Sequence, residues 1–307
     1  PWTIDARSKG SVHVEGDEKG LLPDYPPTPA GQAAFLKKVL EVIQAVPGGK
    51  GKGLSPALWK TTAADTAYFQ SGTGKAPKDG KTIPIYNIIG SINPAAKYRM
   101  IIASHWDSRP YADQDNQKQT EPILAANDGA SGVGIILELA RIISTQKPEW
   151  GVDFVLFDAE DLGLPDQENS FCLGSQYWGK NPHTPNYKAN FGVLLDMVGG
   201  KNAQFMWEEN SNTYANWVLV HTWQIANELG YENQFPLKMI GAITDDHKYV
   251  YEATKIPMID IIQYDPNSGF APFWHTHNDN MEAIDKRTLN AVGNTMLHLI
   301  FNPPPAL

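Results

Sequence analysis

Acidic residues and histidines follow the apolar, strand-like runs of this sequence. Four such runs end in ionisable side chains: 100–104 before His105, 152–157 before Glu160 and Asp161, 191–195 before Asp196, and 240–244 before Asp245. A fifth acidic residue, Asp128, precedes a helix that is predicted to start near Ala130. In an open α/β sheet, ligands bind outside the carboxyl ends of the strands, so we expect these remote residues to meet in one crevice.

Imidazole and carboxylate groups without thiolates are the ligands expected for zinc at a catalytic site. A single aspartate after a strand is more often a helix cap or a turn former, and Asp128 and Asp245 each fit that simpler role. The repetition of ionisable groups at four or five strand ends favours a metal site instead.

A second candidate for metal binding is the stretch PFWHTHNDN, which spans residues 272–280. In an extended segment, positions i and i+2 share a face, so His275 and His277 could both reach one ion. On the residues alone, either histidine or both remain candidate ligands.

Other chemistries fit the sequence less well. The stretch NDGASGVG (127–134) almost contains the Gly-x-Ser-x-Gly pattern of serine hydrolases, but Val133 stands where the second glycine is needed. The sequence has neither a His-Glu-x-x-His motif nor a Gly-x-Gly-x-x-Gly fingerprint. The single cysteine, Cys172, lies among apolar neighbours and is expected to be a buried, inert thiol.

The elements that must position these residues alternate along the chain. Apolar runs predict strands at 83–92, 98–104, 152–158, 191–197 and 256–264, and periodic stretches predict helices at 130–144, 213–229, 246–255 and 284–300. This order indicates an α/β fold: a three-layer sandwich with a mostly parallel, twisted mixed central sheet flanked by helices.

Composition narrows the possible partners. The 307 residues carry a net charge of −9, which argues against nucleic acid or an anionic membrane as the main partner. No run approaches the roughly 18 apolar residues of a membrane span. We expect one catalytic domain over 1–307, in which 1–30 form an extended arm and 31–46 an amphipathic helix. The start at Pro1 indicates processing or trimming.

Five motifs, in order, resemble those of the zinc aminopeptidases with a co-catalytic metal pair and of their relatives, the glutaminyl cyclases. These motifs are SHWDS, ANDGASG, FDAED, LLDMVG and WHTHNDN, and they lie between about residues 98 and 280. The resemblance implies a zinc-exopeptidase-like fold. In the peptidase alternative it implies two metal ions held by His105, Asp128, Asp161, Asp196 and His275, with Glu160 as general base.

In the cyclase branch, the resemblance implies one zinc held by Asp128, Asp161 and His275. Glu160 would then be the general acid/base, and Asp196 and Asp245 would belong to a catalytic hydrogen-bond network. Trp274 would form a wall of the substrate pocket, and Trp106 is a second candidate for packing on the substrate. His277 occupies a position that varies in this branch, so the metal is assigned to His275 and the two-histidine clamp is set aside. Asp279 and Asn280 are expected to brace the loop.

Three features favour the cyclases over the peptidases. They are the form of WHTHNDN, the segment TDDH (244–247), and the sequence from HWDSRPYAD (105–113) to FCLGSQYW (171–178). The last of these looks most like bacterial cyclases. Three others depart from the animal cyclases. The acidic pair is Glu-Asp rather than Glu-Glu, Asp260 replaces a second histidine, and the single cysteine excludes their disulfide. The resemblance also implies a cis peptide bond after Asp128.

Glutaminyl cyclases convert an N-terminal glutamine into pyroglutamate and release ammonia. The resemblance therefore implies that this protein is an enzyme with peptides or proteins bearing N-terminal glutamine as its partners. It further implies one zinc ion, a monomer, and export to the periplasm or outer envelope. Because the nucleophile is the substrate's own α-amine, one zinc acting as a Lewis acid is sufficient.

Overall fold

The computed structural model describes residues 65–305, except residue 168. The predicted arm at 1–30 and the predicted helix at 31–46 lie outside these residues. Eight strands are described: β1 (Thr66–Lys75), β2 (Thr82–Ile92), β3 (Arg99–His105), β4 (Gly151–Phe157), β5 (Phe191–Asp196), β6 (Trp207–Glu208), β7 (Met239–Ile240) and β8 (Met258–Ile262). The helices are α3 (Ala130–Ile143), α4 (Leu173–Lys180), α5 (Glu209–Glu228), α6 (Asp246–Thr254) and α7 (Lys286–Phe301), with a 3-10 helix, η1 (Met281–Ala283).

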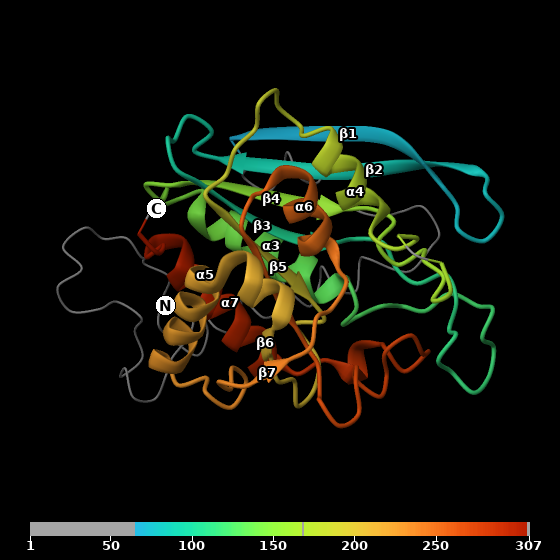
Figure 1. Ribbon diagram of the computed structural model, residues 1–307. Coiled ribbons are helices and arrows are strands. Elements are labelled where there is room, and N and C mark those ends of the chain that lie inside the picture. The colour runs from blue at the N-terminus through green and yellow to red at the C-terminus, as the bar shows by residue number, and fades with distance from the viewer. Residues whose placement is uncertain (1–64, 168, 306–307) are drawn as a thin grey trace.

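Within the described residues, six strands form a mixed sheet in the order β1-β2-β4-β3-β5-β8 (Figure 1). The four strands β4, β3, β5 and β8 run parallel, and β2 pairs antiparallel with both β1 and β4. The predicted α/β class with a mostly parallel mixed sheet is therefore confirmed. The short strands β6 and β7 form a separate parallel pair.

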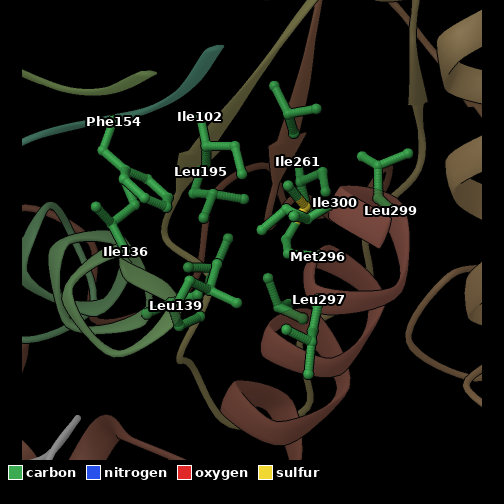
Figure 2. Close-up of a cluster of buried hydrophobic side chains, with 14 of the residues drawn as sticks. Ile102, Ile136, Leu139, Phe154, Leu195, Ile261, Met296, Leu297, Leu299 and Ile300 are labelled. Carbon is green, nitrogen blue, oxygen red and sulfur yellow. The ribbon is translucent and has the colours of Figure 1, made fainter. Parts of the chain in front are cut away.

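Alternate side chains of the strands pack against helices on the two faces of the sheet. On one face, Phe154, Ile102, Leu195 and Ile261 come from four adjacent strands and contact α3 and α7 (Figure 2). The intervening residues, such as Ile101 and Val155, face the opposite way and pack with Trp178 of α4 and Val250 of α6. The alternation that predicted the strands from the sequence thus supplies both cores.

The strand order produces a switch point beside β3. From β3 the chain crosses through α3 to β4 on one side, and it then passes through α4 to β5 on the other side of β3. Ligand crevices form at such points, outside the carboxyl ends of the strands. The fold therefore places the ends of β3, β4 and β5, where the sequence has its acidic residues and His105, around one crevice.

The turn between Asp128 and α3 approaches β3 closely. Gly129 adopts a φ of 98°, and a Cβ atom there would lie 2.9 Å from both the Asp107 carbonyl oxygen and a carbon of the His105 ring. Glycine is the residue that permits both this backbone conformation and this approach. All peptide bonds in the described part of the chain are trans. The prediction of a cis peptide bond after Asp128 is therefore wrong.

One further prediction about elements needs correction, and one edge strand was missed. Residues 240–244 were interpreted as a strand-like run, but β7 ends at Ile240 and the next four residues have no regular structure. The edge strand β1 was not predicted, because its sequence TAYFQSGTGK is rich in glycine and polar residues. None of the helices between residues 65 and 305 combines the length and the apolar character needed to cross a bilayer.

Candidate metal centre and active site

A cavity of about 280 Å³ opens at the carboxyl ends of the parallel strands. Its polar wall contains the predicted site residues Asp128, Glu160, Asp161, Asp196, Asp245 and His275. Its apolar wall contains Pro165, Phe171, Met197, Ile243, Ile262, Phe270 and Trp274. Residues from five separate segments of the sequence are thereby brought to one place, as the strand-end pattern predicted.

The first group of possible metal ligands is Asp128, Asp161 and His275, whose donor atoms all lie within 4.8 Å of one another. His275 Nε2 is 3.1 Å from Asp161 Oδ1 and 3.6 Å from Asp128 Oδ2. All three side chains are buried. Asp128 precedes α3, Asp161 lies in the turn after β4, and His275 lies in the loop between β8 and α7.

The charges of this group favour a bound cation. Burial and the neighbouring Asp161 raise the pKa of Asp128 to about 6. Burial lowers the pKa of His275, but Asp161 and Asp113 outweigh it and raise that pKa to about 9. Asp128 Oδ2 and Asp161 Oδ2 are buried and accept no hydrogen bond within the protein. Two unsatisfied carboxylates beside an imidazole fit a zinc ion in both donor type and charge.

The second group of possible ligands is His105, Asp128 and Asp196, so Asp128 is common to both groups. His105 Nε2 lies 3.2 Å from Asp128 Oδ1 and 3.1 Å from Asp196 Oδ1. Burial lowers the pKa of His105, but contacts with Asp107, Asp128 and Asp196 raise it well above its ordinary value. Positive charge at this position is therefore stabilised, whether a proton on His105 or a second metal ion supplies it.

Glu160 lies at the wall of the cavity beside the first ligand group. Its Oε1 accepts a hydrogen bond from the Cys172 thiol at 3.2 Å. Burial raises the pKa of Glu160 well above its ordinary value; His105 lowers it, and Asp161 and Asp245 raise it further. A cation bound by Asp161 would oppose the effect of these carboxylates and lower the pKa of Glu160 toward its ordinary value.

Asp245 belongs to a buried carboxylate cluster next to Glu160. It caps α6 by accepting a hydrogen bond from the Asp246 backbone N–H, and its donor atoms lie within 4.8 Å of those of His247 and Asp260. Burial and then Asp196 raise the pKa of Asp245 well above its ordinary value. Like charges that are buried this close together disfavour the ionisation of all of them, so the cluster titrates as a unit.

The two tryptophans predicted to contact substrate lie in different environments. Trp274 lines the cavity and stacks on His275, with ring centroids 3.6 Å apart. Trp106 is not among the cavity-lining residues. It packs against the core between the sheet and α3, and its Nε1–H donates to the Tyr86 carbonyl oxygen at 2.9 Å. The predicted contact of Trp106 with the substrate stays a prediction, and these contacts give its indole a place in the packing of the sheet.

The polar residues of the loop PFWHTHNDN make different contacts and have different roles. His277 is partly exposed and pairs through Nδ1 with Asp115 at 2.9 Å, away from the ligand group. Asp279 accepts hydrogen bonds from the backbone N–H groups of Asn127 and Asp128 at 2.8 and 3.1 Å. Asn280 caps η1 by accepting from Glu282 N–H. The predicted bracing by Asp279 and Asn280 is thus present as hydrogen bonds.

Several polar residues of the site were given no role from the sequence. Asp107 accepts hydrogen bonds from the backbone N–H groups of Glu160 and Asp161, each at 3.0 Å, and so fixes the turn that carries both. Arg109 contacts the Asp161 carboxylate, and Asp113 contacts both Arg109 and the His275 ring. Asp107 stands two positions after His105 in the motif SHWDS, and that spacing could have identified it. No local pattern marks Arg109 or Asp113.

Comparison with known proteins gives one family. The sequence profile of peptidase family M28 matches residues 87–300. A solved glutaminyl cyclase of Tannerella forsythia is 41% identical, with a TM-score of 0.80 over 88% of this chain and 97% of its own. A Zn-dependent exopeptidase of Parabacteroides distasonis is 42% identical, with a TM-score of 0.77 over 92% of each chain. The glutaminyl-peptide cyclotransferase of Boiga dendrophila is 27% identical over 90% of this chain and 76% of its own.

Proposed function

Because the chain belongs to peptidase family M28, we propose that it is a glutaminyl-peptide cyclotransferase with zinc as its cofactor. The observation that carries this proposal is the position of Glu160, a buried carboxyl group that lines the same cavity as Asp128, Asp161 and His275. Similarity to a solved glutaminyl cyclase over 88% of the chain favours cyclisation over peptide hydrolysis. The substrates are peptides or proteins with an N-terminal glutamine.

One zinc ion is held by Asp128, Asp161 and His275. When bound, it supplies Lewis-acid activation of the γ-amide carbonyl of the substrate glutamine. Glu160 accepts a proton from the substrate's α-amine as that nitrogen forms its bond to the amide carbon. Glu160 later delivers a proton to the departing ammonia, a type of transfer that contributes about 10²–10⁴-fold to a rate.

The buried carboxylates beside Glu160 keep protons within the site. Asp196 and Asp245 are assigned to this network rather than to the metal. Burial and the charge of Asp196 raise the pKa of Asp245 well above its ordinary value, which favours a proton on Asp245 for donation to the developing charge of the intermediate. Trp274 provides an aromatic wall for the glutamine side chain, and Phe270 and Ile243 extend the apolar lining that excludes water.

A second candidate function is that of a dinuclear aminopeptidase. It is favoured by one observation: the donor atoms of His105, Asp128 and Asp196 also lie within 4.8 Å of one another. In that arrangement, Asp128 would belong to the ligand sets of two metal ions, and the ions would supply an activated water as the nucleophile. The two functions differ in the nucleophile, in the number of metal ions and in the bond that breaks.

Paired substrates separate the two functions. We expect a peptide with N-terminal glutamine to release ammonia and yield a pyroglutamyl product, while a leucine amide remains intact. We also expect about one zinc ion per chain by metal analysis. Cleavage of the leucine amide without cyclisation, together with two metal ions per chain, would establish the aminopeptidase.

The same proposal extends to the organisation of the protein. We propose that residues 1–307 form a single catalytic domain, that the enzyme is a monomer, and that it acts in the periplasm or at the outer envelope of a bacterium. The resemblance of the motifs to those of bacterial cyclases supports this location.

A further inference from the structure

An arginine–aspartate pair behind the cavity connects two of the ligands. Asp113 Oδ1 lies 3.3 Å from His275 Nδ1, the ring nitrogen opposite the one that faces Asp128 and Asp161. Asp113 also accepts hydrogen bonds from Arg109 Nε at 3.1 Å and Nη2 at 2.7 Å. The carboxylate of Asp113 thus contacts both the guanidinium group and the back of a ligand ring.

The other side of the same guanidinium holds the segment that carries Asp161. Arg109 Nη1 donates to the carbonyl oxygens of Asp161 at 2.8 Å and Gly163 at 2.7 Å, and it lies 3.9 Å from Asp161 Oδ1. The Arg109 side chain is 1% exposed, and its guanidinium lies over the rings of Phe171 and Tyr111. A planar fork with this many fixed donors has one geometry in which all of them are satisfied.

We propose that Arg109 and Asp113 form a brace that positions His275 and Asp161 for zinc, a role that rests on the ligand assignment in the proposed function. The two ligands belong to segments more than 100 positions apart in sequence, and the pair contacts both. A ligating histidine needs an acceptor for its second ring N–H, which fixes the tautomer and the ring orientation. Asp113 Oδ1 is the carboxylate oxygen 3.3 Å from that nitrogen, and we assign this role to it, with Arg109 orienting Asp113.

A role through charge and a role in positioning predict opposite effects of Arg109 removal on the affinity for zinc. If the pair acted only through its charges, removing the positive charge of Arg109 would strengthen the attraction of the carboxylates for zinc. If the pair acts as a brace, removing Arg109 frees Asp113 and the turn at 161–163, and zinc binding weakens. The sign of the change in zinc affinity therefore tests the proposal directly.

The experiment measures the dissociation constant for zinc by competition with a chelator, on the full chain and without using enzyme activity. We expect Asp113→Asn and Arg109→Met each to weaken zinc binding by about 10–100-fold, the range measured for outer partners of metal ligands. The double variant should lose about as much as the more severe single variant, because the two residues act as one unit.

A matched control lies at the opposite end of β3. Arg99 and Asp153 form another buried pair, with Nε–Oδ2 and Nη2–Oδ1 distances of 2.8 and 2.6 Å. Arg99→Met should lower the unfolding temperature without changing the dissociation constant for zinc. If Arg109→Met does not fold, Arg109→Lys keeps the positive charge but loses the planar fork, and it should also weaken zinc binding.

Unchanged or tighter zinc binding in a folded Arg109 variant would overturn the brace. The result is independent of the reaction catalysed. A protein that binds zinc in a brace-dependent way but forms no pyroglutamate would retain the brace and refute the cyclase function. An enzyme that forms pyroglutamate, but whose zinc affinity does not change in the Arg109 and Asp113 variants, would retain the cyclase function and refute the brace.

Discussion

Replacing Glu160 with glutamine is expected to lower kcat for the cyclisation of a glutaminyl peptide by about 10²–10⁴-fold while zinc remains bound. Glutamine has nearly the same shape and can still accept the hydrogen bond from the Cys172 thiol, but it cannot exchange a proton with the substrate amine. The metal ligands Asp128, Asp161 and His275 are untouched. The variant should therefore bind zinc as the unmodified protein does, and KM should change little.

Glu209→Gln is the matched control for this substitution. Glu209 is an exposed carboxylate at the start of α5 and does not line the cavity, so this variant should keep full activity. The measurements are steady-state kinetics with a glutaminyl peptide and metal analysis of the purified variants. Loss of zinc from Glu160→Gln would identify Glu160 as a ligand, and nearly full activity would show that another group transfers the proton.

Replacing His275 with alanine is expected to remove zinc and activity together. His275 supplies the nitrogen ligand, and its Nε2 faces Asp161 and Asp128 across 3.1 and 3.6 Å. Loss of an outer partner alone weakens metal binding by up to about 100-fold, so loss of the ligand itself should weaken it further. The substitution also removes the ring on which Trp274 stacks. Zinc affinity and kcat are measured on the same preparation.

His277→Ala provides the comparison within the same loop. His277 pairs with Asp115 at 2.9 Å and does not line the cavity, so its removal should change zinc affinity and kcat by no more than about twofold, as for an ordinary surface substitution. A loss of zinc in His277→Ala equal to that in His275→Ala would restore the two-histidine site that the spacing alone permits.

The sheet and the ends of its central strands could be predicted from sequence because burial imposes a pattern. Strands β3, β4 and β5 are apolar on both faces and end where an ionisable residue begins, so their boundaries are visible in the sequence. The parallel arrangement then brings His105, Glu160 and Asp196 to one edge. This inference needs only the fold class and the chain direction, both of which the alternation of elements supplies.

The rest of the site depends on long-range contacts that a local sequence pattern does not show. Arg109 binds carbonyl oxygens of a turn more than 50 positions away, and no local pattern encodes such a contact. Asp245 follows a segment without regular structure rather than a strand, so its place beside Glu160 comes from the docking of α6. Trp106 adjoins His105 in sequence, yet its indole packs against the core and bonds to Tyr86.

The account depends most on one claim: the nucleophile is the substrate's own amine, not water. In the direct test, a glutaminyl peptide is incubated with the zinc-loaded enzyme in water enriched in a heavy oxygen isotope. The mass of the product is then measured by mass spectrometry. The account predicts a product lighter than the substrate by one ammonia, with no heavy oxygen incorporated. A glutamyl peptide or a released free glutamine that carries heavy oxygen would contradict it.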